Sequence, residues 1–113
     1  MSGCTEKVNH SRVKVEENGR KAVFINDERE DYFVSKVDGC LINDNDVRAD
    51  YLVTKDASVS VLVELKGTDV AHACEQLFRS VDHPAVQPLL ATRLGFLVVC
   101  SKYPRFDTFV AHA

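Results

Sequence analysis

The chain has 113 residues, 45% of them hydrophobic and 27% charged, which is the balance of one small globular domain. Its 17 acidic residues outnumber its 14 lysines and arginines, and the formal net charge of −3 argues against a dedicated nonspecific nucleic-acid binder. No apolar run reaches the roughly 18 residues of a transmembrane helix, and the first residues lack the apolar region of a secretion signal, so we expect a cytoplasmic protein without a membrane partner.

The N-terminal half of the chain predicts antiparallel strands. Residues 1–11 are polar, and we expect a flexible N-terminus ahead of a single domain over residues 12–113. Residues 10–15 alternate basic and apolar side chains, which predicts a strand. The Asn-Gly pair at 18–19 then favours a two-residue hairpin turn, and residues 21–25 predict the return strand.

Three further strands are predicted before the first helix. Residues 32–37 form one, which residues 40–42 are expected to resume after a bend. Residues 47–53 and 59–67 alternate in the same way, and the segment 54–58 between them is rich in turn residues. These two segments therefore predict a second hairpin.

The loop length of this second hairpin decides which side chains meet. If the loop is the three residues 56–58, Asp50 and Glu64 face each other with their Cβ atoms about 5 Å apart. At an effective dielectric of about 20, two such carboxylates repel by roughly 3 kcal/mol. Lys66 on the same face relieves that repulsion, and a divalent metal relieves it better. A loop one residue longer or shorter would break this pairing. The pairs that the loop predicts are Thr54 with Ser60, Leu52 with Leu62, and Asp50 with Glu64.

Beyond the hairpin the sequence predicts a helix, a second helix and a strand. Thr68 is the expected N-cap of the first helix. Residues 85–93 predict a short second helix that stops at Gly95, and the apolar run 96–100 predicts a strand buried on both faces. A last edge strand is expected over residues 106–113. This order predicts an α/β fold with a mixed central sheet, antiparallel hairpins first and a helical crossover later. The apolar stripe of the first helix consists of Val70, Ala73, Cys74, Leu77 and Val81.

The spacing of the acidic residues carries a resemblance to a known family. Asp50, thirteen intervening residues and then Glu64-Leu65-Lys66 resemble the active-site signature of the PD-(D/E)XK nuclease superfamily, which includes restriction endonucleases and Holliday-junction resolvases. The resemblance implies that Asp50, Glu64 and the carbonyl of Leu65 hold Mg²⁺ or Mn²⁺, and that Lys66 positions or activates the attacking water. Gln76 on the following helix fits a glutamine that several branches carry. Without the resemblance, Gln76 is interpreted as a surface residue.

The same resemblance implies a restriction-endonuclease-like core over residues 47–100. It further implies a metal-dependent endo- or exonuclease that hydrolyses phosphodiester bonds, acts on DNA and works as a homodimer. Two departures stand against it: Ala49 replaces the motif's proline, and nothing before Asp50 predicts the family's first helix with its extra acid. The basic residues expected to contact nucleic acid are Arg48, Arg79, Lys102 and Arg105.

Two alternatives to an active nuclease remain open. The first is a nuclease-like domain without catalysis that serves as a binding or regulatory subunit of a protein partner. The second is a small interaction protein in which Asp50, Glu64 and Lys66 form a surface salt-bridge cluster, because oppositely charged pairs across strands are common and each contributes little.

The four cysteines give no metal motif. They stand at positions 4, 40, 74 and 100, too far apart for a zinc knuckle. Since the sequence shows no sign of secretion, structural thiols are expected rather than disulfides or metal ligands.

Overall fold

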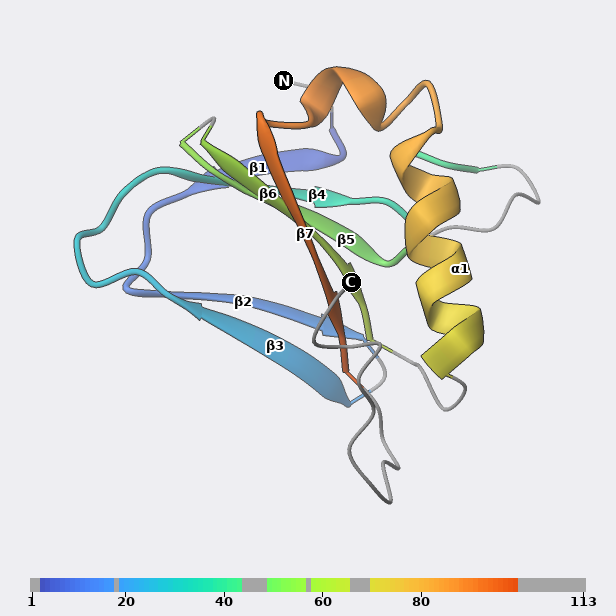
Figure 1. Ribbon diagram of the computed structural model, residues 1–113. Helices are drawn as coiled ribbons and strands as arrows, with labels where there is room; N and C mark the ends of the chain where they lie inside the picture. The colour runs from blue at the N-terminus through green and yellow to red at the C-terminus, as the bar shows by residue number, and fades with distance from the viewer. Residues whose placement is uncertain (1–2, 18, 44–48, 57, 66–69, 100–113) are drawn as a thin grey trace.

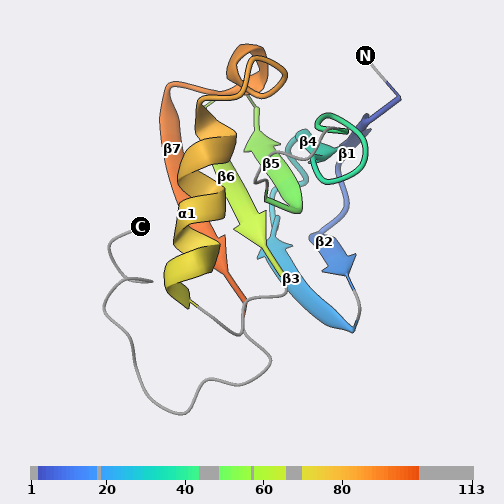
Figure 2. The same cartoon turned by 90° about the vertical axis from the view of Figure 1, so that its right-hand side faces the viewer.

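The computed structural model describes residues 3–17, 19–43, 49–56, 58–65 and 70–99. They form three layers: helix α1, a mixed five-stranded sheet, and a two-stranded hairpin on the far side of the sheet (Figure 1). Figure 2 shows α1 lying along the sheet in front of β6 and β7. The predicted α/β class is confirmed.

The central sheet has the strand order β1-β4-β5-β6-β7. Neighbours are antiparallel from β1 to β6, whereas β6 and β7 are parallel. Parallel neighbours need a crossover connection, and α1 (Val70–Val81) lies between them in the chain. The predicted mixed sheet with a helical crossover is therefore confirmed. Its strands are β1 (Thr5–Val8), β4 (Tyr32–Lys36), β5 (Tyr51–Lys55), β6 (Val59–Glu64) and β7 (Arg93–Val98).

The predicted N-terminal hairpin is also confirmed. Strands β2 (Arg12–Glu17) and β3 (Arg20–Ile25) pair antiparallel, with Glu17 opposite Arg20. The turn between them is therefore the pair at 18–19, as the Asn-Gly sequence predicts. Gly19 has φ +80°, which glycine adopts without steric cost because it lacks a Cβ atom.

The β5–β6 hairpin has the predicted register. Lys55 pairs with Val59, so the loop is three residues long, and Leu52 faces Leu62 while Thr54 faces Ser60. Thr54 and Ser60 also share a side-chain hydrogen bond of 2.8 Å. The alternation of the two strands and the loop length together determined this pairing.

Apolar clusters lie on both faces of the sheet, because successive strand residues point to opposite sides. In the stripe predicted for α1, Ala73 and Leu77 are buried against the sheet, whereas Cys74 and Val81 are only half-buried. The cluster beneath α1 includes Leu52, Leu62, Ala73, Leu77, Val86 and Val98. The cluster beneath the β2–β3 hairpin includes Val13, Val15, Tyr32, Val53, Val63 and Leu65.

The N-terminal segment differs from the expectation of a flexible end. Residues 5–8 form β1, which pairs with β4 at the edge of the sheet. The N–H of Lys36 also donates to the carbonyl of Cys4, at 2.9 Å. Pairing with a neighbouring strand satisfies the backbone groups of this polar segment, and composition alone does not reveal such pairing.

The region after α1 corrects two predictions. The expected helix over 85–93 is a single 3-10 turn, Gln87–Leu89, because Pro88 cannot donate a helical hydrogen bond and Leu90 is already extended, with ψ 136°. Gly95 does not end a helix but lies inside β7, opposite Val61. Strand β7 is mostly half-buried rather than buried on both faces, since it is the edge strand of the described sheet.

The cysteine prediction is wrong for one pair. Cys4 and Cys40 form a disulfide with their Cα atoms 5.6 Å apart, while Cys74 is half-buried on α1. Cys40 lies in a turn over residues 37–42 rather than in a resumed strand, because Leu41 and Ile42 donate back to the end of β4 and the residue after it. Structural disulfides are rare in the cytosol, so this one weighs against the cytoplasmic expectation.

Candidate functional site

Two acidic side chains are buried where strands β5 and β6 meet. Asp50 directly precedes β5, and Glu64 is the last residue of β6. Asp50 and Glu64 are each only 1% exposed to solvent. Among charged residues such burial is unusual, since Asp and Glu are rarely buried unless a partner compensates the charge.

Three hydrogen bonds to the backbone fix the position of Asp50. Its N–H donates to the carbonyl of Val63 at 3.0 Å, and its own carbonyl accepts from the N–H of Val37 at 2.9 Å. Its side-chain Oδ2 accepts from the N–H of Leu65 at 2.7 Å. The Asp50 carboxylate therefore lies against the backbone immediately after Glu64.

This arrangement concentrates negative charge in a dry place. The Oδ1 atom of Asp50 and the Oε1 atom of Glu64 are both fully buried. Moving an ionised carboxylate out of water costs on the order of several kcal/mol of free energy, unless a cation or hydrogen bonds compensate the charge. Burial of these two carboxylates therefore has to be compensated by hydrogen bonds, such as the one from the N–H of Leu65, or by an opposite charge.

The donor set fits one kind of metal. Within the residues that the structure describes, no group of three or more His, Cys, Asp and Glu side chains could hold an ion, so a zinc-type cage is not formed there. Mg²⁺, by contrast, is commonly held by one or two carboxylates together with water and phosphate oxygens. Asp50 and Glu64 satisfy that smaller requirement.

Helix α1 is tied to the start of the Asp50 strand by one serine. Ser80 is fully buried, and its Oγ accepts from the N–H of Ala49 at 2.7 Å and donates to the carbonyl of Gln76 at 2.8 Å. The sequence analysis missed this residue. Its signal was present, because Ser80 extends the buried Ala73–Leu77 stripe by three positions, and a serine within such a stripe needs a hydrogen-bond partner.

The predicted helical residues fall on different sides of α1. Gln76 is half-buried and lies one helical turn from both of the sheet-facing residues Ala73 and Ser80, as expected for a residue at the border of the sheet-facing side. Arg79 is exposed and pairs with Glu75 at 3.4 Å, so no described contact brings it to the carboxylates. The remaining basic site residues, Arg48, Lys66, Lys102 and Arg105, lie outside the described residues.

No family model, curated protein or solved structure matches this chain. No α-helix in the described part of the chain is long and apolar enough to cross a membrane. The assignment of the site therefore depends on the geometry of this chain alone.

Proposed function

We propose that this chain is a metal-dependent nuclease with a restriction-endonuclease-like core. The observation that carries the proposal is the burial of two carboxylates, Asp50 and Glu64, at the open end of the β5–β6 hairpin. Burying two acidic side chains away from water costs on the order of several kcal/mol. A functional role for Asp50 and Glu64 explains why the fold accepts that cost.

The topology supports the same proposal. The two acids stand on an antiparallel hairpin, and the chain then passes through α1 into a strand parallel to β6. This is the order of strands and crossover that the resemblance to restriction endonucleases and resolvases implies. Gln76 is half-buried on α1, the helix after β6, where the resemblance expects the family's glutamine.

Each residue has a separate part in the proposed chemistry. Asp50 and Glu64 would hold Mg²⁺ or Mn²⁺ together with the carbonyl of Leu65. When bound, such an ion would polarise a phosphoryl oxygen of the substrate and lower the pKa of a water molecule. Lys66 would orient the attacking water, and Gln76 would hydrogen-bond the phosphate or its water. A homodimer would provide the surface that one small subunit lacks for a DNA duplex.

A nuclease-like subunit without catalysis is the second candidate. The enclosure of both carboxylates, at 1% exposure each, favours it, because a substrate phosphate must reach the metal. The net charge of −3 points the same way, since nucleic-acid affinity depends on basic surface. In that case the fold would bind a protein partner instead.

The test is cleavage of a panel of single-stranded DNA, duplex DNA, four-way junctions and RNA in Mn²⁺. Wild type should cut at least one substrate, and Lys66→Ala should cut it on the order of 100-fold more slowly, as expected when a group acting in proton transfer is removed. Lys21→Ala, on exposed β3, is the matched control and should cut at the wild-type rate. Equal rates in Lys66→Ala and wild type would refute the assigned role of Lys66. Wild type that neither cuts nor binds Mn²⁺ would refute the nuclease.

A further inference from the structure

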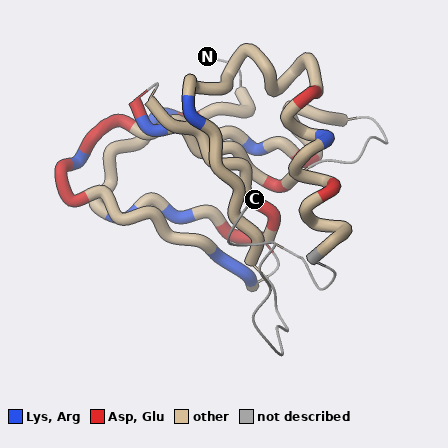
Figure 3. The backbone as a smooth tube through the Cα atoms, viewed as in Figure 1, with Lys and Arg blue, Asp and Glu red and all other residues tan. Residues whose placement is uncertain are grey.

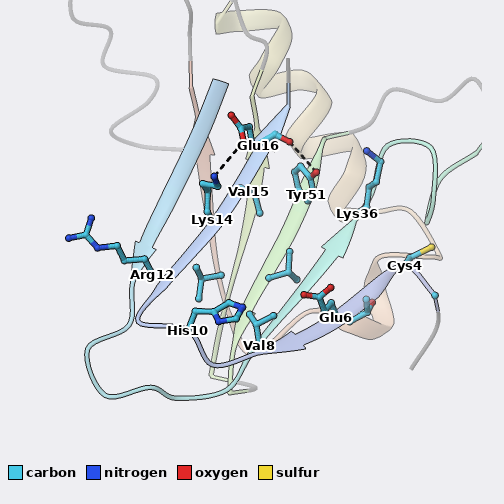
Figure 4. A pocket seen from close by; sticks show the side chains of 14 residues that line it. Cys4, Glu6, Val8, His10, Arg12, Lys14, Val15, Glu16, Lys36 and Tyr51 are labelled. Atoms are coloured by element: carbon cyan, nitrogen blue, oxygen red, sulfur yellow. Dashed lines mark hydrogen bonds and ion pairs between the residues drawn. The ribbon is translucent and has the colours of Figure 1, made fainter. Parts of the chain in front are cut away.

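A groove lies on the face of the sheet opposite α1, away from the carboxylate pair. The β2–β3 layer has only two strands and leaves part of the five-stranded sheet uncovered beside β2. Figure 4 shows β1 and β2 diverging from a common corner near His10, with Tyr51 and Lys36 between them. The open groove there has a volume of about 640 Å³. That lies within the range of ligand pockets, on the order of 300–1,000 Å³.

The floor of this groove is apolar. Val8, Val34 and Tyr51 are half-buried and pack against the same cluster as Val13 and Val15 of β2. Such a floor resembles the surface that β2 already covers, since Val13 and Val15 bury themselves on the sheet. A segment placed beside β2 could therefore bury its own apolar side chains in the same way.

One wall of the groove is an open strand edge. In the described part of the chain β2 pairs only with β3. The hydroxyl of Tyr51 donates to the carbonyl of Glu16 at 3.2 Å, which shows that the backbone of Glu16 is directed into the groove. Backbone direction alternates along a strand, so the N–H and C=O groups of Lys14 and Arg12 point the same way. No described residue hydrogen-bonds them.

The charge along this edge selects the occupant. Arg12 and Lys14 are basic and exposed, whereas Glu16, at the end that Tyr51 occupies, is acidic. Among the described residues, Lys14 forms an ion pair with Glu16 alone, at 3.6 Å, and this pair is weak because both side chains are about half exposed. The free stretch of the edge is therefore basic, and acidic side chains opposite it are favoured.

We propose that an extended segment of a partner protein, with alternating apolar and acidic residues, binds here as a third strand beside β2. Its apolar side chains would lie on Val8, Val34 and Tyr51, and its acidic ones would lie beside Arg12 and Lys14. Main-chain hydrogen bonds to the open edge give affinity in this binding mode, and the alternating side chains give specificity. The proposal does not depend on nuclease activity.

The probe is a short, capped, fluorescently labelled peptide of alternating valine and glutamate, added to full-length ¹⁵N-labelled protein. Amide shifts should concentrate at residues 12–16, and anisotropy should give saturable binding. Lys14→Ala should weaken binding about threefold, the loss of one cross-strand charge pair. Lys14→Pro should abolish it, because proline removes the outward N–H while the β2–β3 ladder remains. Lys21→Ala on β3 should bind like wild type.

A peptide that is N-methylated at alternate residues provides a second measurement on unaltered protein. It cannot donate to the β2 edge and should not bind, so the proposal remains testable even if Lys14→Pro fails to fold. Equal binding of a valine–lysine peptide would overturn the proposal, and so would shifts located away from β2 or no binding at millimolar peptide. A wild-type dimer that dissociates in Lys14→Pro would also overturn it, because the occupant would then be a second copy.

Discussion

At the scale of single residues, Asp50 and Glu64 impose opposing demands on the fold. Asp50 satisfies a backbone donor, the N–H of Leu65, which stabilises the end of the hairpin. Burial of its charge beside that of Glu64 opposes this gain. The amides of Asn and Gln have almost the same shape as these carboxylates but carry no charge, so they separate the two contributions.

We expect Glu64→Gln to lose its response to metal while keeping or increasing its stability in metal-free buffer. With Mg²⁺ or Mn²⁺ at 100 times its dissociation constant, wild type should gain roughly 2.7 kcal/mol. For a domain of this size that corresponds to a rise of about 10 °C in melting temperature. Asp50→Asn should behave in the same way, because its side-chain oxygen can still accept from Leu65. Thermal unfolding monitored by circular dichroism measures both effects.

Glu75→Gln is the matched control, since Glu75 is exposed and pairs only with Arg79 among the contacts of its side chain that are described. It should keep the full metal response. If Asp50 and Glu64 instead form a salt-bridge cluster, the opposite pattern is expected. Glu64→Gln would then destabilise the protein, and metal would not change the melting temperature of wild type or of Glu64→Gln.

At the scale of secondary-structure elements, Ser80 joins α1 to Ala49, the residue before Asp50. Ser80→Ala removes the acceptor of the buried Ala49 N–H. An unsatisfied buried donor costs about 1–3 kcal/mol, so the free energy of unfolding in urea should fall by that amount. Ser58→Ala loses only an exposed hydrogen bond to the carbonyl of Lys55 and should change stability by less than about 0.5 kcal/mol. Equal effects of the two substitutions would contradict the proposed link.

The elements that the sequence predicted are those in which local pattern and tertiary context agree. Strands β5 and β6 alternate cleanly, so their register followed from one loop length, which paired Leu52 with Leu62 and Thr54 with Ser60. The helix expected over residues 85–93 failed because Pro88 limits it to one turn. Strand β1 was missed since its pairing with β4 spans about thirty residues of sequence, and no local pattern encodes such a partner.

The site was predictable where local periodicity determines it. The period of two along a strand accounts for the burial of Asp50 and Glu64, and the half-buried position of Gln76 is consistent with the helical period of 3.6. Ser80 was missed because its role depends on Ala49, thirty-one residues away. The groove beside β2 could not be predicted from the sequence either, because it is formed by a two-stranded layer that packs on a wider, five-stranded sheet.

At the scale of the whole molecule, one covalent link closes the edge of the sheet. The Cys4–Cys40 disulfide joins the start of β1 to the turn after β4, across a separation of 36 residues. The same turn contributes the Val37 N–H that binds the carbonyl of Asp50, so the link also supports the segment beside the carboxylates. Its contribution should therefore appear in global stability, because β1 has only one neighbouring strand in the described sheet.

We expect Cys4→Ser and Cys40→Ser each to lower the free energy of unfolding by about 4 kcal/mol, the loop-closure entropy for a loop of this length. Denaturation in urea with and without dithiothreitol measures it. Reductant should lower the midpoint of wild type and leave both variants unchanged, since they have no such link to break. Cys74→Ser, which leaves the Cys4–Cys40 disulfide intact, should keep the sensitivity of wild type to reductant. If dithiothreitol does not change the urea midpoint of wild type, strand pairing with β4 alone holds β1 in place. Hydrogen bonds, and not the disulfide, would then fix the position of the turn beside Asp50.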